Sequence, residues 1–110
     1  MAILTAQRVT LTPAAPTFVA ADAAGDRVKN NGSLFLEFKN TSASPVTITI
    51  NSVTLCNQGF DHDVTVTVPA TTGDRVVGPF PQTRFNDGDG FLTWTYSAVT
   101  SVTVGAFTLS

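Results

Sequence analysis

Cysteine, charge and long apolar runs are all scarce in this 110-residue chain. Cys56 is the single cysteine, so no disulfide can form within the chain, and a disulfide-stapled scaffold is excluded. One free cysteine is typical of a domain that assembles in a reducing compartment. No apolar run approaches the ~20 residues of a membrane helix, and no basic region precedes an apolar stretch at the N-terminus. We therefore expect neither a membrane span nor a signal peptide.

The charge content is low as well. Charged residues make up 13% of the chain, which is about half of the usual share of ~25%. The formal net charge is −2, and no basic patch is visible, so nucleic acid is not an expected partner. Neutral polar residues must cover the surface instead. A surface with few charges suits a protein that packs against other proteins, because charge is depleted at interface cores.

Residues for catalysis or metal binding are few. The only histidine stands in Asp61-His62-Asp63, and adjacent residues on an extended strand would point to opposite faces. One histidine also falls short of the three or four ligands that zinc takes. The run Asn86–Gly90 resembles the start of a calcium loop but lacks the closing glutamate, so we interpret it as a hairpin turn. We interpret Cys56 as a small buried hydrophobe. The sequence thus predicts no enzyme activity, no metal and no cofactor.

Strict alternation of apolar and polar residues predicts β-strands in four segments. Ser33–Asn51 indicates a strand, a turn and a second strand, and 64–68 and 92–96 alternate in the same way. The residues expected to face inward are Leu34, Leu36, Phe38, Val46, Ile48, Ile50, Val64, Val66, Val68, Leu92, Trp94 and Tyr96. Turn residues separate the segments at short intervals. The expected fold is all-β: a single domain over residues 1–110, built as one antiparallel β-sandwich or jelly-roll-like barrel of about seven to nine short strands.

The N-terminal third is less regular. Ala6–Thr12 indicates a first strand, and Thr17–Ala20 is compatible with a short one. Residues 1–7 are expected to form an N-terminal arm, and residues 21–32 a polar loop. Further along, the pattern of Val53–Phe60 is ambiguous.

Three local features of the C-terminal half complete the expected elements. Two prolines flank Phe80, so 79–81 is expected to be an extended rod. Thr83–Phe85 is compatible with brief strand pairing. Phe107 and Leu109 are out of phase with the valines at 102 and 104, which predicts a β-bulge at Gly105-Ala106.

Four segments together resemble a known family. Val28–Ile50, Val66–Ala70, Gly78–Pro81 and Tyr96–Val104 occur in an order similar to that of small β-sandwich structural proteins of tailed bacteriophages, the head decoration or cement proteins. The resemblance implies a non-enzymatic virion protein on the capsid surface, present in the host cytoplasm during assembly. It implies the major capsid protein as partner and a homotrimer as the assembly. Some relatives serve at the neck, connector or tail instead, and that alternative stays open.

Contact residues are expected in the irregular parts of the chain. In the arm these are Ile3 and Leu4, and in the polar loop they are Arg27 and Lys29, which could bind an acidic partner. Phe80 between its prolines is a candidate anchor that loses little entropy on binding. The alternatives are a solvated loop for the two cations and a core-capping aromatic for Phe80.

A carbohydrate-binding module is the second alternative function. Trp94 and Tyr96 could stack against a sugar ring if they were exposed in a groove. Their strand spacing with Leu92 instead favours a place in the core.

Overall fold

The structure of the chain, a computed structural model, describes residues 2–9, 16–52 and 63–108. The ambiguous segment Val53–Phe60, with Cys56, lies outside the described residues, as do His62 and Leu109. The expectations for these residues therefore stay predictions.

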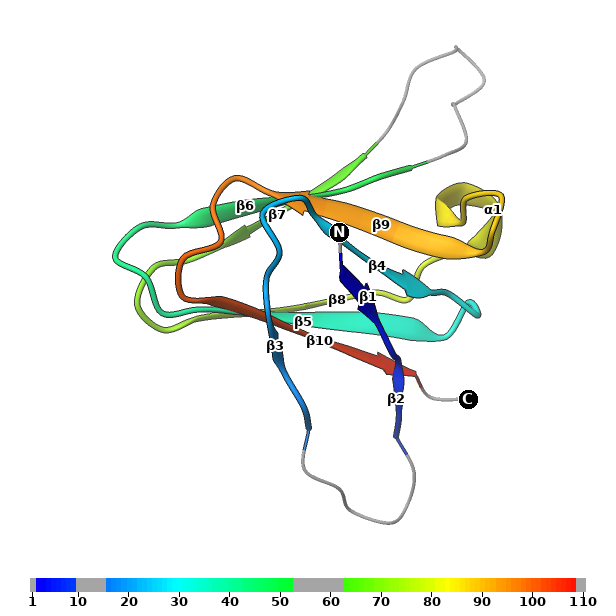
Figure 1. Cartoon of the computed structure of the whole chain (residues 1–110), viewed down its shortest axis with the longest axis horizontal. Coiled ribbons are helices and arrows are strands. Elements are labelled where there is room, and N and C mark those ends of the chain that lie inside the picture. Colours follow the sequence, from blue (N-terminus) through cyan, green and yellow to red (C-terminus); the bar gives the residue numbers. More distant parts are fainter. Residues whose placement is uncertain (1, 10–15, 53–62, 109–110) are drawn as a thin grey trace.

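The described chain contains ten strands, rather than seven to nine, in two mixed β-sheets, and one short helix, which confirms the all-β class (Figure 1). The first sheet, sheet A, has the order β1 (Ala2–Leu4), β4 (Asp26–Lys29), β9 (Phe91–Tyr96), β6 (Val46–Ile50), β7 (Val64–Val68). The second, sheet B, has the order β2 (Gln7–Arg8), β10 (Val102–Thr108), β5 (Leu34–Asn40), β8 (Gly73–Val77), with β3 (Val19–Ala20) also paired to β10. Most pairs are antiparallel, as predicted, but β1–β4 and β2–β10 are parallel.

One core collects the inward-facing side chains of both sheets. Of the twelve predicted core residues, nine are at most 1% exposed, and Val64, Val66 and Tyr96 are partly buried against them. The ring of Phe38 from sheet B meets Trp94 from sheet A edge-on, with centroids 6.1 Å apart. The period-two pattern therefore identified the core correctly, because each of these strands keeps one face away from solvent.

The predicted polar loop at 21–32 is wrong for its central part. Asp26–Lys29 is strand β4, which lies inside sheet A between β1 and β9. Its inward residues are Val28 and Asp26, and both are fully buried. A charged residue on the inward face hides the alternation, since aspartate in a sequence normally indicates a solvated position.

The N-terminal residues are part of both sheets rather than a separate arm. Strand β1 pairs with β4 in sheet A, and β2 pairs with β10 in sheet B. Leu4 is 9% exposed and joins the core. The Gln7 amide exchanges two hydrogen bonds with the backbone of Thr17, at 2.6 and 2.7 Å, which ties β2 to the segment before β3. The predicted strand Ala6–Thr12 corresponds to β2 only in part.

The predicted bulge at Gly105-Ala106 is absent. Strand β10 keeps one register against β5, from Val102 opposite Asn40 to Thr108 opposite Leu34. Both faces of β10 carry buried residues, because Phe107 packs on the outer face between the rings of Phe18 and Phe35. Gly105 makes room for these rings, since a Cβ there would lie 2.9 Å from Phe107 and 3.1 Å from Phe18.

A short helix replaces the strand expected at Thr83–Phe85. Helix α1 (Gln82–Phe85) follows Pro81, and Phe85 packs edge-on against Phe80 with centroids 5.3 Å apart. The turn at Asn86–Gly90 is confirmed: Asp87 Oδ1 accepts hydrogen bonds from the backbone N–H groups of Asp89 and Phe91, each at 2.9 Å. The described part of the chain contains no helix with the length and hydrophobicity needed to span a bilayer.

Candidate contact surfaces

The structure separates the five predicted contact residues into two groups. Ile3 is 59% exposed, Lys29 is exposed and Arg27 is half-buried, and all three lie on the outer face of sheet A. Leu4 and Phe80 are in the core, and Phe80 is only 2% exposed. Phe80 is therefore a core-capping aromatic, which was the alternative to its role as an anchor. The side chains of Leu4 and Phe80 are both too buried for a partner to contact them in this fold.

Ile3, Arg27, Lys29 and Phe91 form a basic corner on the outer face of sheet A. Ile3 stands opposite Arg27 in the β1–β4 register, and Lys29 stands opposite Phe91 in the β4–β9 register. The guanidinium of Arg27 and the ammonium of Lys29 each lie 4.7 Å from the centre of the Phe91 ring. The Lys29 ammonium also donates to the backbone oxygen of Asp89 at 2.6 Å. Cation–π contacts of this kind hold both cations in place on the sheet surface.

Asp87 is a carboxylate close enough to the basic corner to interact with the charge of Arg27, and it also accepts hydrogen bonds within its own turn. Its pKa is lowered, first by the hydrogen bond from the backbone N–H of Phe91, and further by the N–H of Asp89 and the charge of Arg27. Asp87 therefore stays ionised, and its negative charge offsets part of the positive charge of the basic corner.

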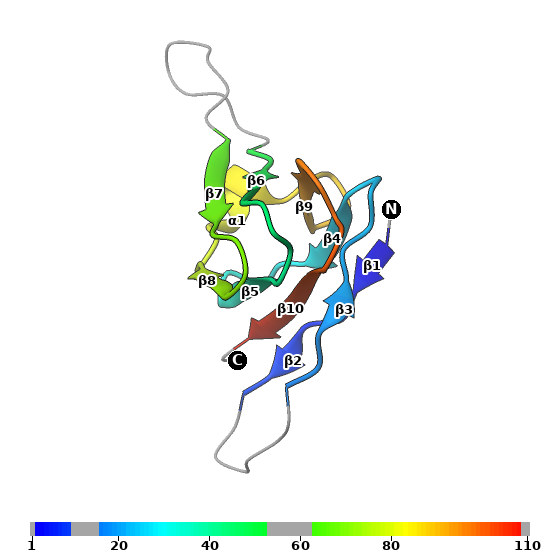
Figure 2. The same ribbon diagram turned by 90° about the vertical axis from the view of Figure 1, so that its left-hand side faces the viewer.

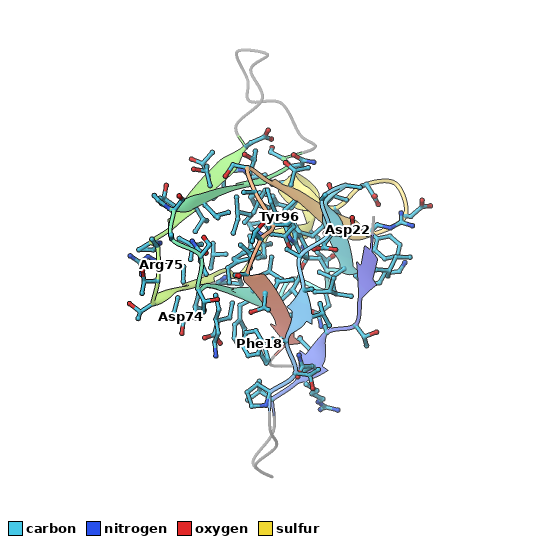
Figure 3. All side chains as sticks on the ribbon, turned by 60° about the vertical axis from the view of Figure 1, so that its left-hand side comes forward. Phe18, Asp22, Asp74, Arg75 and Tyr96 are labelled. Carbon is cyan, nitrogen blue, oxygen red and sulfur yellow. The ribbon has the colours of Figure 1, made fainter. Side chains whose placement is uncertain are left out.

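Glu37, Asp74 and Val76 form an acidic patch on the outer face of sheet B. Val76 stands opposite Glu37 and is 63% exposed, and Asp74 is two residues away on the same face of β8. The pKa of the Glu37 carboxyl is raised, first by partial desolvation and then by the hydrogen bond and charge of Asp74. Figure 3 shows Asp74 on the side of the molecule opposite Asp22. Two carboxyl groups thus face each other beside an exposed valine.

The cation closest in register to the acidic patch is Lys39, which stands opposite Asp74. Its ammonium lies over the ring of Phe18, 4.3 Å from the centroid. Lys39 lowers the pKa of Glu37, but this is the weakest of the effects that act on that group. Lys39, together with Arg75, whose guanidinium donates to the backbone oxygen of Asp74 at 2.9 Å, therefore offsets part of the negative charge of the acidic patch.

Two apolar hollows adjoin these surfaces. One of about 450 Å³ lies between the N-terminal strands, β3 and β10, and its lining includes Leu4, Val19 and Val104. The other, of about 300 Å³, is lined by Gly32, Ser33, Phe35, Val76, Gly78 and Pro79. The second hollow thus borders the acidic patch and could receive a small apolar side chain.

Three side chains in the interior of sheet A form a linear chain of hydrogen bonds. Trp94 Nε1 donates to the Tyr96 hydroxyl at 2.7 Å, and the hydroxyl donates to Asp26 Oδ2 at 2.6 Å. Desolvation, followed by the hydrogen bond to Asp26, raises the pKa of Tyr96 far above its usual value. Figure 3 shows Tyr96 inside the molecule, between the strands. Because Trp94 is fully buried, it cannot stack against a sugar ring.

Residues 2–9, 16–52 and 63–108 contain no cluster of three or more histidine, cysteine, aspartate or glutamate side chains. Asp63 is the one described member of Asp61-His62-Asp63, and its Oδ1 accepts a hydrogen bond from the backbone N–H of Ser52 at 2.8 Å. The role of Asp63 in the described structure is therefore to fix the end of β6.

Sequence reasoning missed the acidic patch. One signal was present: Val76 and Val77 are adjacent on a strand, so one of them must face outward. The structure shows that this residue is Val76, while Val77 packs against the core.

Comparison with known proteins does not identify a function for these surfaces, because no family model, no curated protein and no solved structure matches the chain.

Proposed function

We propose that the chain is a non-enzymatic structural protein of a virion, a capsid decoration or cement protein that stabilises a phage head by binding the major capsid protein. In this proposal the two sheets form a β-sandwich that serves as a rigid support for contact surfaces. The observation that supports it is the exposure of two aliphatic side chains, Ile3 and Val76, on hydrogen-bonded strands. The order of the four segments Val28–Ile50, Val66–Ala70, Gly78–Pro81 and Tyr96–Val104, which resembles that of head decoration proteins, also supports the proposal.

Exposed aliphatic groups on a rigid sheet favour association with another protein. Burying one isoleucine or valine side chain from full exposure contributes about 1.5–3 kcal/mol. Ile3 and Val76 are already held by strand pairing, so little backbone entropy is lost when a partner covers them. A small protein placed where capsomers meet can bridge several of them, and weak contacts then add through multivalency.

The proposal includes the expected assembly and location. The protein is placed on the outer surface of the capsid as a homotrimer, and in the host cytoplasm before it is added to the head. The alternative location is the neck, connector or tail of the same virion, where exposed aliphatic groups would serve equally well. The carbohydrate-binding alternative has lost its main support, because Trp94 is fully buried and the Tyr96 hydroxyl is bonded to Trp94 and Asp26.

The test is the amount of protein on purified particles of the phage whose genome encodes the chain, measured by quantitative mass spectrometry. Ile3→Thr keeps a β-branched residue in β1 but removes apolar contact area, so we expect lower occupancy and lower heat stability of the particles. Thr67→Ser, at an exposed position of sheet A, is the control and should change neither. Absence of the protein from purified particles would overturn the proposal.

A further inference from the structure

The two most exposed large hydrophobic residues of the described chain have neighbours of opposite charge. Ile3 is 59% exposed and stands directly opposite Arg27, with Lys29 next along the same face. Val76 is 63% exposed and stands directly opposite Glu37, with Asp74 next along its own strand face. The basic corner and the acidic patch therefore have the same layout, one exposed aliphatic group beside two like charges, with the sign reversed.

The two surfaces cannot meet within one molecule. Strand β1 is at one edge of sheet A, and β8 is at the opposite edge of sheet B. Figure 2 shows β1 and β8 on opposite sides of the molecule. Complementary surfaces on opposite sides of one chain can meet only between copies, and such a contact is head to tail.

Each surface has neighbouring groups of opposite charge that offset part of its own charge. Asp87, beside Arg27, accepts from two backbone N–H groups of its own turn. Lys39, beside Glu37, lies over the ring of Phe18. These groups offset each surface only in part, and the charge that remains can attract a surface of opposite sign.

We propose that the chain associates with a second copy of itself, head to tail, through these two surfaces. The basic corner of one copy covers the acidic patch of the next, with Arg27 and Lys29 facing Glu37 and Asp74. Ile3 contacts Val76 and enters the neighbouring hollow of about 300 Å³. Repetition of this contact gives a closed ring or an open chain, depending on the rotation between copies. The inference rests on the homotrimer of the proposed function and deepens it, because it assigns Ile3 and Val76 to the contact between copies. The isolated protein tests this contact separately from capsid binding.

The test is the mass of the isolated protein by sedimentation velocity over a range of concentrations and salt. We expect association that weakens as salt rises, since exposed charges are screened. Asp74→Lys and Lys29→Glu should each weaken association by about tenfold or more, because each places like charges together. The double variant Asp74→Lys/Lys29→Glu restores opposite charges across the contact and should associate again.

Controls separate this contact from general charge effects. Thr65→Lys/Thr67→Lys changes the net charge by the same amount as Asp74→Lys, at exposed positions of β7 in sheet A, and should associate like the parent protein. Val76→Ser tests the apolar part without changing charge, and should also weaken association. Circular dichroism confirms that each variant is folded. A protein that is monomeric at all concentrations, or a folded double variant that fails to recover, would overturn the inference.

Discussion

The Tyr96 hydroxyl joins Trp94 on its own strand to Asp26 on β4, and Tyr96→Phe removes both hydrogen bonds with the loss of one oxygen atom. A hydrogen bond to a charged group contributes about 1.5–3 kcal/mol, and a buried donor left without a partner costs about 1–3 kcal/mol. Asp26 would be left with one long bond, from the backbone N–H of Asp22 at 3.3 Å, because its Oδ1 has no partner among the described residues. We expect a loss of about 3 kcal/mol in the free energy of unfolding.

Urea unfolding followed by circular dichroism measures this loss directly. For a domain of this size, ~3 kcal/mol corresponds to a fall in Tm of about 12–18 °C. Thr95→Ala is the control, because Thr95 lies on the same strand but is exposed, and its effect should stay within about 0.5 kcal/mol. A loss below ~1 kcal/mol for Tyr96→Phe would show that the hydrogen-bond chain does not hold β4 and β9 together.

Three further substitutions test other parts of the structure. The fold raises the pKa of Glu37 and therefore favours its neutral form; Asp74 contributes to this increase, and the charge of Lys39 opposes it. The stabilisation from the neutral form is complete below the usual pKa of a glutamate and is lost as the pH rises through the raised pKa. Glu37→Gln should therefore flatten the fall in Tm over that pH range, and an unchanged pH profile would contradict the assignment. Gly73→Ala should lower the free energy of unfolding by about 3 kcal/mol or more, because the new Cβ would lie 1.9 Å from the carbonyl oxygen of Pro69. If urea unfolding gave the variant the same stability as the parent protein, this close contact would be refuted. Leu4→Ala should cost about 2–3 kcal/mol and speed amide exchange in β1 and β4, whereas unchanged exchange would mean that the N-terminal strands are held without the core.

The strands with a simple pattern could be predicted from the sequence, and β4 could not. Leu34, Leu36 and Phe38 alternate with polar residues, so burial on one face is visible in the residue types alone. In β4 the inward residue Asp26 is stabilised by Tyr96, which is 70 positions away. A buried carboxylate becomes acceptable only when the two strands meet, and no local pattern contains that information.

The contact surfaces depend even more on register. Ile3 could be proposed from its place in the irregular N-terminal segment, but its position beside Arg27 follows from the parallel pairing of β1 and β4. Val76 becomes an exposed neighbour of Glu37 only when β8 pairs with β5 in one particular register. Phe80 was a plausible anchor because two prolines flank it, yet helix α1 brings Phe85 against its ring and closes it into the core.

A density map of whole phage particles, compared with particles that lack this protein, tests the proposed function most directly. A decoration protein should give extra density on the outer surface of the head, at positions where capsomers meet, with the size of a small two-sheet domain. Extra density at the neck or along the tail would contradict the decoration assignment and favour the connector alternative. Identical maps would contradict a structural role in the virion altogether.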